Sequence, residues 1–234
     1  MILWIILFLL IVAISFVLAY RSMRDYQEIP HQSKTEYGLY LVRNPENFNK
    51  DFLDRFNKLL VKEGLIVSFE RLFKGSQAAL TIYGPKKVLE EFIGELNLLE
   101  LEDYTFNLDH NHLSIWEVGV TENTKHKELN IENIFADLAR LGNEDQFFWQ
   151  VVLGPKQKGQ LFASQIRAVV YSKDPQKRQE LVPILQNIAS SELLKVPNPF
   201  TQQQMVSFFK SRSLAKDSRG PLLEADQVHR LLKV

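Results

Sequence analysis

The sequence contains no cysteine, which removes disulfide bonds, thiolate metal sites and cysteine nucleophiles together. It also lacks an excess of either charge, because 28 Lys and Arg residues balance 28 Asp and Glu residues. A neutral chain has no global field that would attract a phosphate backbone, so direct nucleic-acid binding is not expected. The absence of cysteine fits a reducing compartment, and we expect the soluble part to be cytoplasmic.

Charged side chains are also missing from the first 20 residues. A helix needs about 20 apolar residues to cross the hydrocarbon core of a bilayer. We therefore predict a transmembrane helix over residues 1–22, in which aromatic residues near the two ends favour the membrane interfaces. The residues that mark this helix are Ile2, Trp4, Phe8, Val12, Phe16 and Tyr20.

A cleaved signal peptide is the alternative for this segment. The apolar run has no basic region before it, exceeds the usual signal-peptide length and ends without a clear small-residue cleavage site. Arg21 and Arg24 directly follow the run, and positive charge favours the cytoplasmic side. The sequence thus predicts a single-pass protein of the inner or plasma membrane with its C-terminal part in the cytoplasm.

A polar linker over residues 23–36 precedes a first α+β module, predicted over residues 37–121. Apolar residues at three- and four-residue steps favour helices, and β-rich runs favour strands. The predicted order is strand 38–43, helix 48–63 ended by Gly64, hairpin strands 65–73 and 78–83, helix 85–96, and strand 113–120. This β-α-β-β-α-β order is typical of ferredoxin-like folds.

The same order of elements is predicted again over residues 122–210. It comprises helix 131–141 ended by Gly142, strands 146–153 and 161–171, a helix beginning at Asp174 and Pro175, and a closing strand 205–209. Strand 146–153 is apolar on both faces, which predicts a central place in a covered sheet. The fold class is therefore α+β, with two tandem ferredoxin-like modules and a C-terminal tail with a short helix over residues 211–234.

Gly154 and Gly159 have the spacing of the glycines in a phosphate-binding loop. Gln160 and Leu161 stand where Lys and Ser or Thr would be required, and a strand follows where a helix is needed. We interpret this segment as a hairpin turn.

His110 and His112, beside Asp109, could hold a metal ion only with a third fixed ligand, and the sequence indicates none. Acidic pairs such as Glu90-Glu91 and Glu144-Asp145 are interpreted as solvated loops. No catalytic, cofactor-binding or metal-binding residue is therefore assigned, and no enzymatic activity is expected.

A basic stretch lies before the last predicted helix and contains Lys210, Arg212, Lys216 and Arg219. These side chains could contact phosphates, anionic lipid headgroups or the acidic face of a partner. A solvated linker is the preferred interpretation.

Residues 144–155 (EDQFFWQVVLGP) resemble the region before the motor domain in membrane-anchored ATPases of the bacterial type IV secretion coupling-protein class, which act in conjugative transfer. Further similar stretches follow in the same order. They are Ile166-Arg167, Asn198-Pro199-Phe200, Phe208-Phe209 with Arg212, and residues 222–232, preceded by residues 39–43 and 66–70.

The resemblance implies a membrane-tethered cytoplasmic assembly domain. Such ATPases carry Walker motifs in their motor, and this sequence has none, so no ATP-binding residue is carried over. We expect a non-enzymatic scaffold, either an accessory subunit of a secretion or DNA-transfer ATPase or the N-terminal part of one, which binds a P-loop ATPase or associates with itself. A membrane-tethered sensor that binds a small ligand between the two modules is the alternative.

Overall fold

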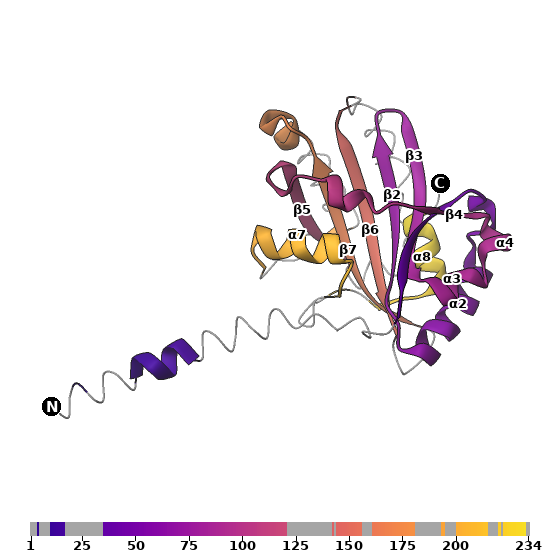
Figure 1. Ribbon diagram of the computed structural model, residues 1–234, viewed down its shortest axis with the longest axis horizontal. Helices are drawn as coiled ribbons and strands as arrows, with labels where there is room; N and C mark the ends of the chain where they lie inside the picture. The colour runs from indigo at the N-terminus through magenta and orange to yellow at the C-terminus, as the bar shows by residue number, and fades with distance from the viewer. Residues whose placement is uncertain are drawn as a thin grey trace.

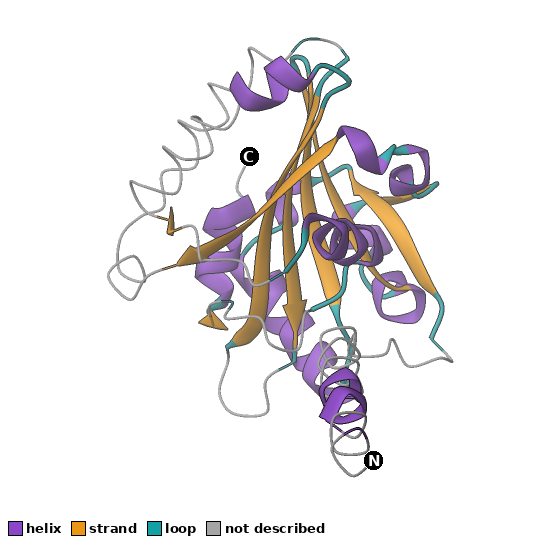
Figure 2. Cartoon of the chain, turned by 90° about the vertical axis from the view of Figure 1, so that its left-hand side faces the viewer, coloured by secondary structure: helices purple, strands orange, loops and turns teal. Residues whose placement is uncertain are grey.

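The computed structural model, shown in Figures 1 and 2, describes most of the chain beyond residue 34 and parts of the preceding segment. The described residues are 4, 10–16, 35–120, 142, 144–155, 161–180, 193–194, 200–214, 220 and 222–232. Within these ranges, no helix is both long enough and apolar enough to span a membrane. Most of the predicted anchor, residues 23–34 of the predicted linker 23–36, and the predicted helix 131–141 lie outside them.

One antiparallel sheet forms the centre of the molecule (Figure 1). Eight strands adjoin in the order β4-β1-β3-β2-β6-β7-β5-β8, and β9 pairs with β7. The strands are β1 (Tyr37–Val42), β2 (Val67–Lys74), β3 (Gln77–Pro85), β4 (Leu98–Leu101), β5 (Leu113–Val120), β6 (Gln146–Gly154), β7 (Phe162–Tyr171), β8 (Leu193–Leu194) and β9 (Leu222–Leu223). The sheet and its helices confirm the α+β class.

The pairing of β2 with β6 joins the two halves of the sheet. Its register runs without interruption from Val67 opposite Leu153 to Lys74 opposite Gln146. We call this pairing the β2–β6 seam. All residues of β6 after Gln146 are buried, so the prediction of a central strand covered on both faces is confirmed.

Helices cover both faces of the sheet (Figure 2). On the first face, which we call the α2 face, the apolar core contains residues of α2 (Lys50–Glu63), α3 (Lys86–Glu90), α4 (Ile93–Leu96) and α8 (Ala225–Leu232). On the opposite α7 face, a second cluster contains residues of α7 (Gln202–Ser211) with partly buried Tyr104 packed against it. Three short 3-10 turns also occur in the described residues, namely η1 (Pro45–Asn47), η2 (Tyr104–Asn107) and η3 (His110–His112).

Helix α2 shows how local signals set its limits. The side chain of Asn49 accepts a hydrogen bond from the backbone N–H of Phe52 at 3.0 Å and thereby caps the first turn. Gly64 ends the helix in the left-handed conformation (φ 65°), as the sequence predicted. Phe52 and Phe56, one turn apart, are fully buried and stack with ring centroids 5.4 Å apart.

The predicted closing strand 205–209 is wrong, because these residues belong to helix α7. Thr201 and Gln204 form a capping box, in which each side chain hydrogen-bonds to the backbone of the other residue. Met205, Phe208 and Phe209 have the spacing of one helical face, and all three are buried against the sheet. A short apolar run of this kind fits a strand or a helix until its cap is recognised.

Strand 113–120 exists as predicted, but it does not close the first half of the sheet. That place is taken by β4, which pairs with β1, whereas β5 pairs with β7 and β8. Strand β4 was not predicted, because its leucines directly follow a helical apolar pattern. The single helix predicted over residues 85–96 is two helices, α3 and α4, because Phe92 leaves the helical conformation (φ −111°, ψ 3°).

Gly154, at the end of β6, allows the segment after α7 to approach the sheet closely. A Cβ atom at this position would lie 2.5 Å from Cδ1 of Leu214, which packs with Ile66 and Val152. We expect Gly154→Ala to lower the free energy of unfolding by about 1–3 kcal/mol, because the added methyl group overpacks this cluster. Urea unfolding of the solubilised protein measures the change.

Gly94→Ala is the matched control for this prediction. A Cβ atom at Gly94 meets nothing within 4 Å, and the residue lies in helix α4. Alanine there should leave stability unchanged or raise it by up to about 1 kcal/mol. Equal effects of the two substitutions would contradict the close approach of Leu214.

Candidate functional site

A row of five polar side chains crosses the α7 face of the sheet. They are direct cross-strand neighbours in the order Thr81, Glu70, Gln150, Arg167 and Glu117, from β3, β2, β6, β7 and β5. All five are buried. The row crosses the β2–β6 seam between Glu70 and Gln150, so it contains residues from both halves of the sheet. We call this row, with the side chains that contact it, the polar network.

The carboxylate of Glu70 lies at the centre of the polar network and accepts four hydrogen bonds. Oε1 accepts from Ser68 Oγ, Gln150 Nε2 and Arg212 Nε, each at 2.9 Å. Oε2 accepts from the hydroxyl of Tyr104 at 2.6 Å. Because the carboxylate has no exposure to water, these four donors take over the role of its hydration shell.

Arg212 supplies the charge that balances Glu70. It ends α7 in the left-handed conformation (φ 52°), and only 1% of its side chain is exposed. Its Nη1 and Nη2 donate to the two carboxylate oxygens of Asp103 at 2.6 and 3.0 Å. The guanidinium lies over the ring of Tyr83, 4.3 Å from its centroid. Burial alone would lower the pKa of Arg212, but the neighbouring carboxylates raise it above the ordinary value.

Arg167 connects the row to the end of helix α7. Its Nη1 donates to Gln150 Oε1 at 2.6 Å and to the carbonyl of Phe208 at 3.1 Å, and its Nη2 donates to the carbonyl of Ser213. Gln150 Nε2 donates to the carbonyl of Phe209 at 3.1 Å. Cations are favoured at helix C-termini, where carbonyls lack intrahelical partners. Burial lowers the pKa of Arg167 to about 10, so the side chain stays charged at neutral pH.

Asp103 and Tyr104 belong to the connection that crosses the α7 face between β4 and β5. The side chain of Asp103 begins η2 by accepting from the backbone N–H and hydroxyl of Thr105 at 2.9 and 2.8 Å. Burial would raise the pKa of Asp103, but the hydrogen bonds from Arg212 and Thr105 lower it overall. Burial raises the pKa of Tyr104 well above its usual value, so its hydroxyl stays protonated and donates to Glu70.

The polar network is closed to a substrate. Glu70, Arg167 and Arg212 are at most 1% exposed, and their hydrogen bonds run to other groups of this chain. A general acid, base or nucleophile must reach the reacting atom directly or through one water. The arrangement therefore holds segments together, namely the two halves of the sheet, the connection that carries η2, and the end of α7.

The interpretation of Arg212 as part of a solvated basic linker is wrong. Lys210 of the same stretch also contacts the fold, because its Nζ donates to the carbonyl of Leu108 at 2.7 Å. Lys216 and Arg219 lie outside the described residues. One sequence signal points to the network, namely that Arg167 interrupts a strand that is otherwise largely apolar.

The other candidate segments have local roles. Asp109 accepts from the backbone N–H of Asn111 at 2.9 Å, and Nδ1 of His110 and His112 lie 3.9 and 3.8 Å from its carboxylate. Across the described ranges, no group of three or more His, Asp or Glu side chains is arranged to hold a metal ion. Gly154 pairs with Ala163 in the antiparallel β6–β7 pair, so the strands on either side of the predicted turn are neighbours, whereas residues 156–160 of the turn itself lie outside the described residues.

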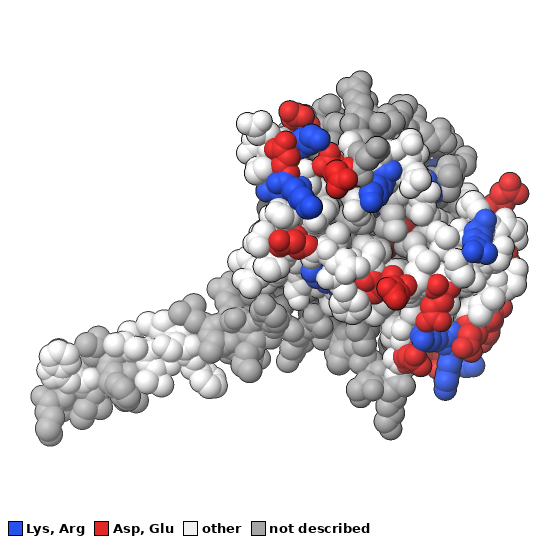
Figure 3. Space-filling view, turned by 45° about the horizontal axis from the view of Figure 1, so that its top comes forward, with Lys and Arg blue, Asp and Glu red and all other residues white. Residues whose placement is uncertain are grey.

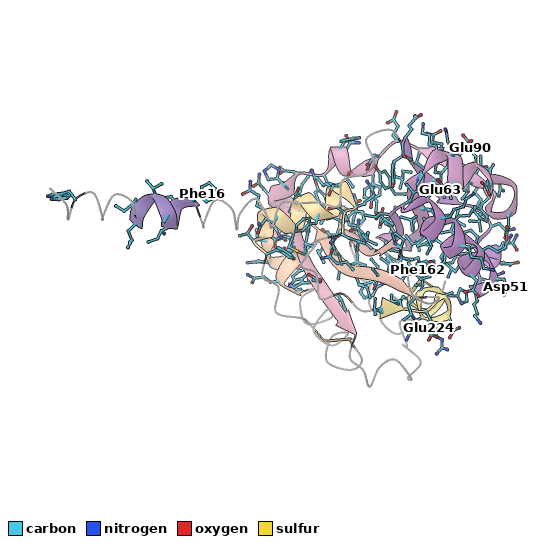
Figure 4. All side chains as sticks on the ribbon, turned by 90° about the horizontal axis from the view of Figure 1, so that it is seen from below. Phe16, Asp51, Glu63, Glu90, Phe162 and Glu224 are labelled. Carbon is cyan, nitrogen blue, oxygen red and sulfur yellow. The ribbon has the colours of Figure 1, made fainter. Side chains whose placement is uncertain are left out.

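The structure describes only part of the predicted anchor. Trp4 and residues 10–16 are helical, and Trp4, Val12 and Phe16 are exposed. Figure 4 shows Phe16 projecting from this helical segment. Ile2, Phe8, Tyr20, Arg21 and Arg24 lie outside the described residues, so the anchor and its orientation stay predictions.

No protein-family model matches the sequence. No curated protein matches it either. Among solved structures, the crystal structure of an anthrone oxidase-like protein is similar to 78% of this chain and 86% of its own, with 12% sequence identity and a TM-score of 0.23. A TM-score this low carries no inference about fold or activity.

Removal of the Arg212 charge should leave two buried or partly buried carboxylates without their main partner. We expect Arg212→Met to lower the free energy of unfolding by about 3–5 kcal/mol, because breaking one side of a buried ion pair leaves an uncompensated charge. Combining it with Glu70→Gln should recover part of this loss, which a double-mutant cycle in urea measures. Arg55→Ala, which breaks the exposed pair with Glu95, is the control and should cost at most about 1 kcal/mol. Similar losses of stability for Arg212→Met and Arg55→Ala would contradict the role of Arg212 in holding β2, η2 and the end of α7 together.

Asp103 should make stability depend on pH in the acid range. Its folded-state pKa is lowered, so its stabilising contribution is complete above the ordinary pKa of about 4 and is lost as pH falls through the folded-state value. We expect the free energy of unfolding of the wild type to fall as pH drops below about 4. The difference in stability between the wild type and Asp103→Asn should shrink over the same interval. A difference that does not change with pH would show that the Asp103 carboxylate is not held charged by Arg212.

Proposed function

We propose that this chain is a membrane-anchored, non-enzymatic scaffold that serves a secretion or DNA-transfer ATPase, either as an accessory subunit or as its assembly region. The observation that carries the proposal is the closed polar network. Its charged groups, which would be the first candidates for catalysis, are hydrogen-bonded to partners within the chain and largely shielded from solvent. Such a network fixes the relative positions of the segments that it connects, which suits a scaffold better than a catalyst.

The way in which the halves are joined also supports a scaffold. Eight consecutive residue pairs link β2 to β6, and the polar network spans the same seam on the α7 face. On the α2 face, α8 packs against α2 and β2 although β9, just before it, pairs with β7. The C-terminal residues thus connect both halves and both faces. A platform of this kind can present fixed surfaces to a partner.

At the level of fold, we propose two ferredoxin-like modules fused edge to edge. If the strands of each half are numbered in chain order, β4-β1-β3-β2 and β8-β5-β7-β6 both read 4-1-3-2. A helix also occurs at an equivalent place in each half, because α3 follows the third strand of one half, β3, and residues 175–180 form a helix after the third strand of the other, β7. Shared order and antiparallel pairing support a repeated β-α-β-β-α-β unit.

The resemblance to type IV secretion coupling-protein ATPases supports the choice of partner. The stretches that carry it supply most of the polar network, namely Glu70, Gln150, Arg167, the Phe208 and Phe209 carbonyls, and Arg212. Residues that build one buried network must occur together for it to form. The resemblance therefore concerns a physical unit of the fold, although individual stretches are short.

Co-purification tests this proposal. The tagged full-length chain is solubilised in detergent from membranes of its own host, and stoichiometric partners are identified by mass spectrometry. We expect a Walker-containing ATPase to be recovered from the membrane fraction, because a scaffold for that motor binds it directly. Glu224→Lys, an exposed substitution outside the polar network, is the control and should recover the same partner.

Recovery of the chain alone would contradict the scaffold proposal and favour the small-ligand sensor. A thermal-shift screen against nucleotides and metabolites would then identify the ligand, since a ligand that binds only the folded state raises the melting temperature.

A further inference from the structure

Strand β4 lies at one end of the strand order and pairs only with β1 among the described strands. Its register, from Leu39 opposite Leu101 to Val42 opposite Leu98, is regular and contains no bulge. The outer edge of β4 therefore offers backbone N–H and C=O groups in strand geometry. Such an edge is a template for a further strand.

The usual protections of an edge strand are mostly missing from β4. Its sequence, Leu-Leu-Glu-Leu, has neither proline nor lysine. Leu99 is 38% exposed, and Ile93, just before the strand in α4, is 42% exposed. Shortness and the charge of Glu100 are the remaining protections. Together the edge combines free backbone groups with exposed apolar side chains.

The chain around this edge is strongly acidic. Residues 88–111 contain seven Asp and Glu residues and no Lys or Arg. Three of the acidic side chains have a basic partner, because Glu95 pairs with Arg55, Glu100 with Lys86, and Asp103 with Arg212. The right-hand part of Figure 3, where α2, α3, α4 and β4 lie in Figure 1, shows acidic side chains around a few basic ones.

Three of the remaining acidic side chains have no basic partner among the described residues, and all three are exposed. They are Glu90, Glu91 and Glu102. Glu90 lies at the periphery of the molecule in Figure 4. The exposed Lys87 of α3 offsets one of these three charges, so the surface beside β4 keeps a net negative charge.

We propose that the outer edge of β4 is a docking site for an extended segment of a partner protein in which basic and apolar residues alternate. Main-chain hydrogen bonds to β4 would supply affinity, Leu99 would contact the apolar side chains, and the carboxylates of Glu91 and Glu102 would select the basic ones. A second copy of this chain fits poorly, because pairing two β4 edges brings like charges together.

This inference rests on the proposed scaffold function. It identifies the β4 edge as the surface of the scaffold that binds a strand of the partner. Its test is independent, because peptide binding to the purified chain requires neither the host membrane nor an ATPase. A failure of peptide binding leaves co-purification unaffected, and a failure of co-purification leaves the peptide result unaffected.

The probe is a fluorescent octapeptide of alternating lysine and valine with blocked termini, and its binding to the detergent-solubilised full-length chain is measured by fluorescence anisotropy in about 0.15 M salt. We expect saturable binding. The same peptide with every backbone nitrogen methylated should bind at least about tenfold more weakly, because it cannot donate main-chain hydrogen bonds along either edge. A peptide of alternating glutamate and valine should bind more weakly still.

Charge reversal at the edge locates the site. Glu91→Lys combined with Glu102→Lys should weaken binding of the lysine peptide at least about tenfold and strengthen binding of the glutamate peptide. Glu224→Lys is the control, since Glu224 is exposed on the side of the molecule away from Glu90 in Figure 4, and it should change neither affinity by more than about twofold. Equal binding of the methylated and unmethylated peptides, equal effects of the edge and control variants, or no binding at all would overturn the proposal.

Discussion

The rest of the structure depends on the burial of one carboxylate, that of Glu70. Burying a carboxylate away from water costs free energy unless hydrogen-bond donors surround it. The cost is offset only when several donors contact its oxygens in good geometry. Here the donors come from its own strand, from the opposite half of the sheet, from η2 and from the end of α7. Four segments far apart in the sequence are therefore fixed relative to one another.

The same carboxylate also constrains the register of the β2–β6 seam. Side chains alternate between the faces of a strand, so a slip by one residue would move Glu70 into the apolar core of the α2 face, away from every donor. The apolar side chains on that face, including Phe69 and Trp149, supply burial but tolerate many arrangements. The polar network on the opposite face distinguishes among them. We infer that burial stabilises this sheet and the polar row specifies its pairing.

Local signals explain how much of this was predictable from the sequence. Helix α2 was predicted because its apolar spacing and Gly64 act within a few residues of each other, and β6 because its run is apolar on both faces. The role of Arg212 was not predictable, since its partners Glu70 and Asp103 are 142 and 109 residues away. The apolar pattern of a short run such as residues 205–209 does not distinguish a helix from a strand. Strand β4 was not predicted because its leucines follow the apolar pattern of α4 without a break.

Fusion of the halves also determines where this protein can bind a partner strand. Pairing of β2 with β6 uses one edge of each half, so the described sheet ends at β4 on one side and at β8 on the other. Leu193–Leu194 offers only two residues in strand conformation, whereas β4 offers four in regular register beside exposed leucine and glutamate side chains. Because the buried polar groups hydrogen-bond to one another, a partner protein must be recognised by groups at the surface. On that surface, β4 is the described edge where backbone, apolar and charged groups coincide.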